Sequence, residues 1–167
     1  MEWSEYVEFT AATSLPGTDN PEYLRLGILE EAHEALAAYA SLQAAIHGRA
    51  KRVLRGDPAN VLQAKTDAAV IAYRQLVEEL GDLAWYVARM MANGKQYCIP
   101  AIMSPHIGNV ARAIRTFEAR PFAEYAADLL AEFLDLALVE LNVVLDANVI
   151  KLTTRKAAGT IQGEGSR

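Results

Sequence analysis

Apolar residues recur along most of the chain with the 3.6-residue period of amphipathic helices, and residues 75–87 are the clearest case. Their apolar side chains fall on one continuous stripe: Leu76, Val77, Leu80, Leu83, Ala84 and Val87. Glu79, Asp82 and Tyr86 lie at i, i+3 and i+7 along one flank of that stripe. The two carboxylates repel each other at a cost of about 0.2–0.5 kcal/mol, which a bound cation would remove. This flank is the first indication of a metal site.

Helix-breaking and helix-capping residues divide the rest of the chain. The breaker cluster at 15–21 must form a loop, and Asn20 can cap a helix that begins at Pro21. The expected helices span 3–13, 21 to about 46, 57 or 58 to 91, about 107–119, and 122–156. Alanine is abundant and strand-forming runs are scarce. We therefore predict an all-α fold, a bundle of about five helices in a single domain over residues 1–167, completed by oligomerisation.

Composition narrows the class of protein. The 167 residues are 52% hydrophobic and 22% charged, which is typical of a globular protein. No apolar run reaches membrane-spanning length, and the N-terminus lacks a positive region before an apolar stretch. The single cysteine, Cys98, cannot form an internal disulfide, and the net charge of −5 argues against general nucleic-acid binding. We expect a cytoplasmic protein with neither a membrane nor a stable nucleic-acid partner.

A second acidic element lies in the helix that begins at Pro21. Glu30, Glu31 and Glu34 are expected on one side of this helix, with Gly27 among them. A glycine inside a helix costs about 1 kcal/mol relative to alanine, and its gap would let a ligand or another backbone approach. A solvated acidic face is the usual explanation of one such cluster. The second acidic set on another helix makes that explanation weaker here.

Cations follow near the C-terminus. Asn148, Lys151 and Arg155 fall at i, i+3 and i+7 on one helix face, an arrangement suited to phosphate oxygens. Stabilisation of a helix C-terminus by cations is the alternative explanation. The basic segment 47–55 is better interpreted as solvated surface than as a phosphate-binding loop.

The two acidic sets and the C-terminal cations together suit the binding of a divalent metal ion and a polyphosphate. Carboxylates at i, i+3 on two antiparallel helices can enclose one or two Mg²⁺ ions, which prefer oxygen ligands. The metal would neutralise a polyphosphate and could lower the pKa of a water that acts as the nucleophile. Lys151 and Arg155 would then hold the remaining phosphate charge.

The same residues resemble the signature of a known family. The chain contains Glu31-x-x-Glu34 followed by Glu79-x-x-Asp82, together with the segments LGILEE, ELGDLAWY and NVIKLTTR and a Gly-rich tail. This ordered set is similar to the motifs of the MazG-like all-α nucleoside triphosphate pyrophosphatases. That superfamily also includes dimeric dUTPases and phosphoribosyl-ATP pyrophosphatases. The resemblance touches both ends of the chain, and its specificity lies in the ordered set of motifs.

The resemblance implies a function and a site. The implied reaction is hydrolysis of a nucleoside triphosphate between the α- and β-phosphates, giving a monophosphate and pyrophosphate, as in house-cleaning of nucleotide pools. The implied metal is Mg²⁺, with Mn²⁺ as a substitute, held by Glu31, Glu34, Glu79 and Asp82. Glu30 would be a further ligand or a water-orienting base, which makes Glu30 and Glu31 the catalytic candidates.

The resemblance also assigns the substrate contacts and the assembly. Asn148, Lys151 and Arg155 would contact the phosphates of the substrate. Apart from the resemblance, the aromatic rings of Tyr86 and Trp85 are suited to stacking on a base, although aromatic core packing explains both residues at least as well. The family is oligomeric, so a homodimer or a dimer of dimers is expected.

This chain departs from the compact family pattern, because 44 residues separate Glu34 from Glu79 and 65 separate Asp82 from Asn148. Substrates of compact relatives therefore do not transfer to it directly.

Two rival functions remain. Glu30-x-x-His33 resembles half of a di-iron site, but no second Glu-x-x-His occurs. A zinc-protease motif also fails, because Ala37 stands where its second histidine should be. The other rival is a non-enzymatic helical interaction module whose acidic pairs only decorate its surface.

Overall fold

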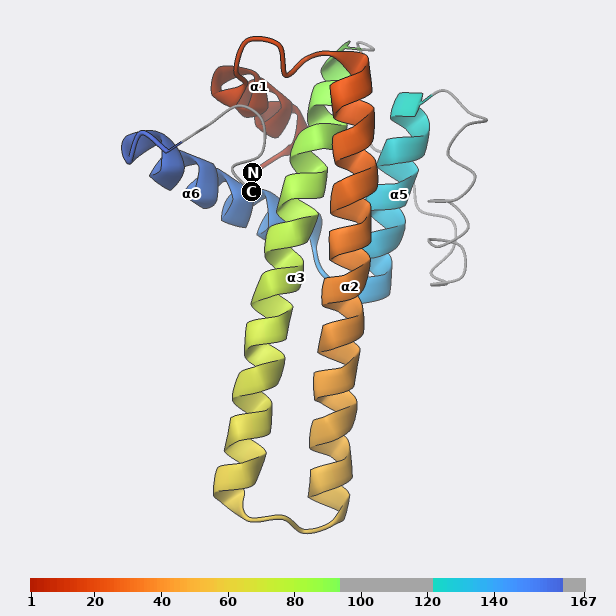
Figure 1. The fold of residues 1–167 in the computed structure, drawn as a ribbon, viewed down its shortest axis with the longest axis vertical. Helices are drawn as coiled ribbons and strands as arrows, with labels where there is room; N and C mark the ends of the chain where they lie inside the picture. Colours follow the sequence, from red (N-terminus) through yellow and green to blue (C-terminus); the bar gives the residue numbers. More distant parts are fainter. Residues whose placement is uncertain (94–121, 161–167) are drawn as a thin grey trace.

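The computed structural model describes residues 1–93 and 122–160, with the side chains of 122–125 excepted. Over these ranges the chain forms helices and no strand, which confirms the predicted all-α bundle (Figure 1). The helices are α1 (Trp3–Thr13), α2 (Pro21–Leu54), α3 (Ala59–Asn93), α5 (Phe122–Ala137) and α6 (Leu141–Ala157). The bounds predicted for the first helix are confirmed. Cys98 and the helix predicted near 107–119 lie outside the described residues.

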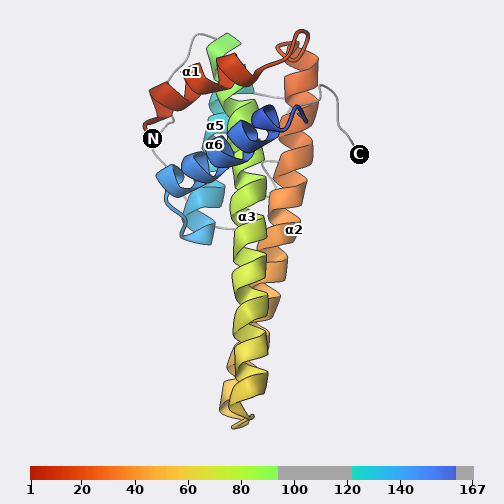
Figure 2. The same cartoon turned by 90° about the vertical axis from the view of Figure 1, so that its left-hand side faces the viewer.

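The long antiparallel pair α2 and α3 forms the axis of the molecule (Figure 1). The α2 helix begins as the sequence indicates, because the side-chain oxygen of Asn20 accepts from the backbone N–H of Glu22 at 2.8 Å and Pro21 follows the cap. The half of the pair that ends in the α2–α3 turn at 55–58 extends beyond all other described helices (Figure 2). We call this half the two-helix arm. None of the described helices is both long enough and apolar enough to cross a membrane.

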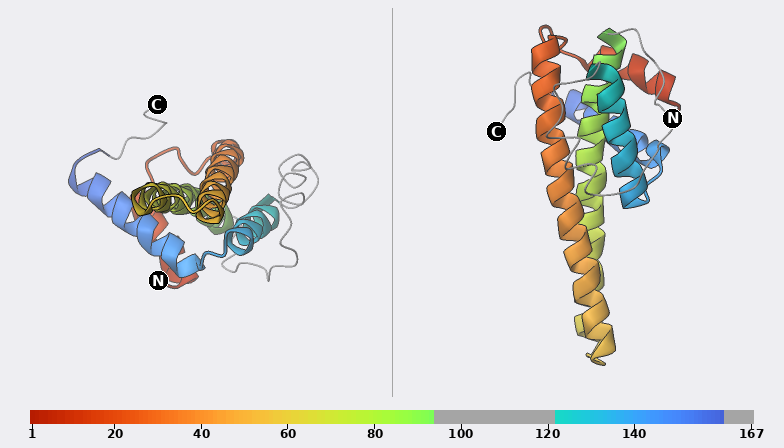
Figure 3. Two further views of the ribbon diagram at one scale, coloured as in Figure 1. Left: turned by 90° about the horizontal axis from the view of Figure 1, so that it is seen from below. Right: turned by 90° about the vertical axis from the view of Figure 1, so that its right-hand side faces the viewer.

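The other helices pack around the opposite half of this pair. The α5 helix contacts both α2 and α3, whereas α1 and α6 contact α3 and each other. Seen along the axis, α5 and α6 lie on different sides of the pair (Figure 3). The core between the helices contains the largest buried side chains: Tyr6, Leu24, Ile28, Leu76, Leu80, Leu83, Met91, Leu129, Leu130, Phe133 and Leu145.

An ion pair between buried Arg89 and exposed Asp19 fastens the α1–α2 loop to the end of α3. The guanidinium of Arg89 is buried, and its Nη2 lies 2.6 Å and 2.7 Å from the two carboxylate oxygens of Asp19. Asn93 donates from Nδ2 to the backbone oxygen of Asp19 at 2.7 Å. Because these contacts fix the entry to α2, they also fix the register of its acidic residues against α3.

The prediction that the second helix ends near Ile46 is wrong. The α2 helix passes through Gly48 and ends at Leu54. Gly56 adopts φ 68° and donates its N–H to the backbone oxygen of Val53, and the N–H of Asp57 donates to that of Arg52, which closes the helix end. The penalty of about 1 kcal/mol for Gly48 is small beside the packing of α2 on α3. The basic residues of segment 47–55 are solvent-exposed, as predicted, but all of them except the capping residue Arg55 lie on α2.

The prediction of one continuous last helix is also wrong. The chain breaks between α5 and α6, where Leu138 adopts φ 54°. The N–H of Leu138 bonds to the oxygen of Asp135, and the N–H of Val139 bonds to that of Leu134, which is the hydrogen-bond pattern of a helix end that usually carries glycine. The break lets α6 turn away from α5 and lie across α3 (Figure 2).

Candidate active site

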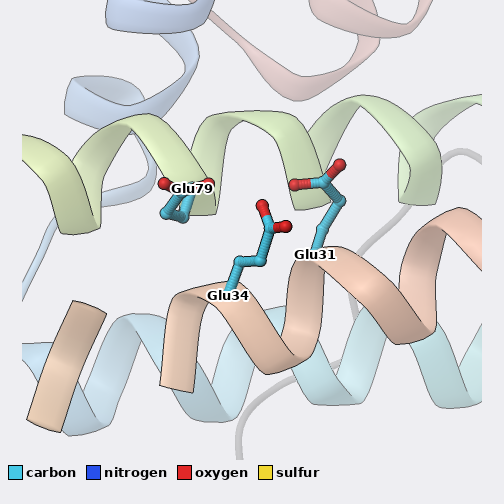
Figure 4. Close-up of side chains that lie close together, drawn as sticks. All are labelled: Glu31, Glu34 and Glu79. Atoms are coloured by element: carbon cyan, nitrogen blue, oxygen red, sulfur yellow. The ribbon is translucent and has the colours of Figure 1, made fainter. Parts of the chain in front are cut away.

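Three glutamates meet between α2 and α3. Glu31 and Glu34 project from successive turns of α2, and Glu79 projects from the facing turn of α3 (Figure 4). One carboxylate oxygen from each lies within 4.8 Å of the others. We call these three residues the carboxylate cluster. Adjacent and opposite ligands of Mg²⁺ lie about 3 Å and 4.2 Å apart when each metal–oxygen distance is about 2.1 Å, so small side-chain movements would bring the cluster to that spacing.

The electrostatics of the cluster favour a bound cation. Glu31 is only 9% exposed, and its burial, together with the charges of Asp82, Glu34 and Glu79, raises its pKa to about 8. The pKa of Glu79 is also raised, first by burial and then by Glu34 and Asp82. Bringing these carboxylates together therefore costs free energy that protonation or a cation can remove. Their oxygen donors are the type that Mg²⁺ prefers, so the cluster fits the predicted metal.

Asp82 lies one turn further along α3 and has different partners. One of its carboxylate oxygens accepts from Nδ2 of Asn148 at 3.0 Å, and the other accepts from Nζ of Lys151. Lys151 lowers the pKa of Glu31 and Glu79, whereas Asp82 raises both values. The Asp82–Lys151 pair and the carboxylate cluster therefore interact electrostatically. The assignment of Asp82 as a metal ligand stays a prediction.

The predicted phosphate-contacting residues of α6 separate in space. Asn148 is 2% exposed and Lys151 is partly buried, and both reach Asp82 across the α3–α6 contact. Arg155, one turn later, is exposed in the last turn of α6 together with Lys156. Helix-end stabilisation therefore describes Arg155 better than Lys151, which instead contacts a carboxylate beside the cluster.

The catalytic candidates of α2 also separate. Glu31 is buried in the cluster, whereas Glu30 is exposed and does not belong to it. Of the three glutamates that the helical wheel places on one side of α2, only Glu31 and Glu34 belong to the cluster. The ring of His33 is exposed, and its Nδ1 lies 2.7 Å from the backbone oxygen of Leu29.

The gap at Gly27 holds an aromatic ring, where we had expected a ligand or a backbone. A Cβ atom added to Gly27 would lie 2.1 Å from Cε1 of Tyr86, so only glycine at this position leaves room for the ring. The hydroxyl of Tyr86 lies 3.3 Å from that of Tyr23, and burial raises its pKa. Trp85 is turned toward α1, where its Nε1 donates to Oγ1 of Thr13 at 3.4 Å. Both aromatic residues thus have packing roles, and stacking on a base stays a prediction for Tyr86.

The sequence interpretation missed two residues that hold this region together. Tyr6 of α1 is fully buried and donates from its hydroxyl to Oδ1 of Asn148 at 2.8 Å. Gly81 lets Asn148 approach, because an added Cβ would lie 3.0 Å from the Cβ of Asn148. No local signal could have found the Tyr6 contact, since 142 positions separate the partners.

Comparison of the chain with protein-family models, with curated proteins and with solved structures finds no match. The MazG-like resemblance therefore depends on the motif residues themselves.

Proposed function

We propose that this protein is a Mg²⁺-dependent nucleoside triphosphate pyrophosphohydrolase of the MazG-like type. The observation that supports this proposal most is the meeting of Glu31 and Glu34 with Glu79, whose motifs are 44 residues apart in the sequence. A charged amine from a third helix, Nζ of Lys151, lies beside the same region on Asp82. Negative metal-binding groups and a neighbouring cation are what a metal–triphosphate complex requires.

Each group has a role in the proposed reaction. Glu31, Glu34 and Glu79 would hold Mg²⁺, with Asp82 as the fourth carboxylate. When bound, Mg²⁺ supplies positive charge that offsets the charge of the triphosphate and lowers the pKa of the attacking water.

Water attacks one of the two phosphorus atoms joined by the oxygen that bridges the α- and β-phosphates, the bond from that phosphorus to the bridging oxygen breaks, and the nucleoside monophosphate and pyrophosphate leave. A glutamate accepts the proton of the water, and the two candidates are Glu31, which is buried in the cluster, and Glu30, which is exposed one residue before it. Lys151 would donate to phosphate oxygens when substrate draws its Nζ from Asp82.

Conservative substitutions test the site. Glu34→Gln and Asp82→Asn remove a charge with little change in volume, so each should abolish Mg²⁺-dependent turnover and leave the helical circular-dichroism signal intact. Glu78→Gln is the matched control, because Glu78 is an exposed neighbour of Glu79 on α3. Wild-type turnover in either site variant, or equal loss in the control, would refute the assignment.

The two-helix arm supports the second part of the proposal, assembly into a homodimer or a dimer of dimers. Several large apolar side chains are exposed on it: Ile46, Val53, Leu54, Val70, Ile71 and Tyr73. At helical spacing, Ile46 and Val53 continue the face of α2 that begins with Leu42 and Tyr39. Burial of such a stripe against a second copy would remove it from water.

Light scattering tests this assembly. We expect at least a dimer mass at micromolar concentration, and a shift to the monomer mass for the double variant Ile46→Glu and Val53→Glu. A strictly monomeric mass in an active wild-type sample would refute the proposed assembly. The same stripe would serve a helical interaction module, so a multimer without any turnover would favour that alternative function.

A further inference from the structure

A hydroxyl from the first helix reaches the candidate site through the core. Tyr6 is 0% exposed, and its hydroxyl lies 2.8 Å from Oδ1 of Asn148 and 3.4 Å from the backbone oxygen of Gly81. Burial raises the pKa of Tyr6 well above its usual range, so the phenol keeps its proton. The hydroxyl is therefore available as a donor at any physiological pH.

The chemistry of the partners fixes the direction of each hydrogen bond. The carboxylate of Asp82 accepts from Nζ of Lys151 on one oxygen and faces Asn148 at 3.0 Å with the other, so the side-chain group of Asn148 that donates to it is the NH₂. The amide oxygen of Asn148 then faces Tyr6, whose hydroxyl must donate to it. If the amide of Asn148 turned over, its NH₂ would meet the hydroxyl and its oxygen would meet a carboxylate, which is repulsive.

The packing around Asn148 leaves its side-chain amide little room to adopt another orientation. Asn148 is 2% exposed, and the missing side chain of Gly81 provides the space for it, because a Cβ there would lie 3.1 Å from Nδ2. A chain of contacts thus links Tyr6 on α1, Asn148 on α6, Asp82 on α3 and Lys151 on α6.

We infer that Tyr6 is a positioning residue for Asp82, acting through the side-chain amide of Asn148, an inference that builds on the proposed phosphohydrolase function. By fixing which end of the amide faces α3, Tyr6 keeps one carboxylate oxygen of Asp82 engaged. The second oxygen remains directed to Lys151 or, during turnover, to the metal–substrate complex. The role requires no contact between Tyr6 and substrate.

Tyr6→Phe removes only the hydroxyl, and the chain offers a matched control. Thr10 lies on the same helix, is equally buried and bonds its hydroxyl to the backbone oxygen of Val7 at 2.8 Å, away from Asn148. Tyr6→Phe and Thr10→Val should therefore lower the melting temperature to a similar extent. Only Tyr6→Phe should lower kcat, by roughly tenfold for one lost hydrogen bond, with a smaller change in KM.

A double-mutant cycle tests the route of the effect. In an Asn148→Ala background, Tyr6→Phe should change kcat less than twofold, because the group through which Tyr6 acts is gone. Unchanged kcat after Tyr6→Phe in the wild-type background would overturn the inference. An effect of equal size in both backgrounds would overturn it as well.

A spectroscopic readout keeps this inference separate from the proposed activity. The side-chain NH₂ of Asn148 can be assigned in a ¹H–¹⁵N spectrum by its loss in Asn148→Ala. In Tyr6→Phe its two protons should shift and exchange faster with solvent, whereas Thr10→Val should leave them unchanged. If the wild type proves inactive on every nucleotide, the proposed function fails while this spectrum still decides the role of Tyr6. An unperturbed Asn148 amide in Tyr6→Phe would overturn the inference whatever the activity.

Discussion

The carboxylate cluster predicts that the metal-free protein loses stability as the pH rises. Folding raises the pKa of Glu31 from 4.5 to about 8. Between these values the folded state holds a proton that the unfolded state has released. The stabilising contribution of the protonated carboxyl is therefore complete below pH 4.5 and is lost by about pH 8. Glu79, whose pKa is also raised, contributes with the same sign.

The substitution Glu31→Gln isolates this contribution, because glutamine has nearly the same shape and never ionises. A shift from 4.5 to about 8 corresponds to an upper limit of about 5 kcal/mol at 1.36 kcal/mol per pKa unit. Water that enters around the charged carboxylate lowers this cost, and we expect about 2 kcal/mol. At pH 8 without metal, the variant should therefore be more stable than the wild type by about that amount, whereas at pH 4.5 the two should be similar.

Urea unfolding in EDTA at pH 4.5, 6 and 8 would measure the effect. The free energy of unfolding should fall across this range in the wild type and in the exposed control Glu78→Gln. The fall should be smaller in Glu31→Gln, where Glu79 still contributes. Saturating Mg²⁺ at pH 8 should stabilise the wild type but not Glu31→Gln. The same pH slope in Glu31→Gln and the wild type would refute the reasoning, as would stability that rises with pH.

Two further predictions concern neighbouring residues. Lys151→Ala should lower kcat/KM by about 10- to 150-fold, the value of a lost charge-assisted hydrogen bond, and Arg155→Ala should have a milder effect, as steady-state kinetics beside thermal melts would show. Unchanged kinetics in both variants would leave Arg155 as a helix-end stabiliser and Lys151 as a structural partner of Asp82. Gly27→Ala should cost about 1–3 kcal/mol of stability, because its Cβ would lie 2.1 Å from the ring of Tyr86. Adding Tyr86→Ala should relieve part of that loss in denaturant unfolding, and strict additivity would argue against the clash.

Local sequence signals accounted for most of the helices and for the cluster. Periodicity located α1 and α3, and the i, i+3 spacing of Glu31 and Glu34 placed both on turns that face Glu79. Antiparallel pairing of neighbouring helices then brings the two motifs near each other, although the contacts of Asp19 that fix their register were not predicted. The helix positions follow from spacing alone, which a single sequence provides.

The remaining features depend on contacts that a single sequence does not contain. The break at Leu138 lacks the glycine that usually marks a helix end, and buried Val139 anchors the chain after it. The contacts of Asp82 with Lys151 and of Tyr6 with Asn148 depend on how α6 crosses α3. The burial of Glu31 relative to exposed Glu30 follows from the packing of α2 and α3, which a helical wheel only approximates.

The most direct test of the central claim is product analysis with a panel of common and modified ribo- and deoxyribonucleoside triphosphates. Phosphorus-31 NMR would follow each nucleotide with Mg²⁺ and with EDTA, for the wild type and for Glu34→Gln. The account predicts that at least one nucleotide yields the monophosphate and pyrophosphate in equal amounts, only with Mg²⁺ and only in the wild type. Release of orthophosphate instead, equal turnover in Glu34→Gln, or no turnover of any nucleotide would contradict it.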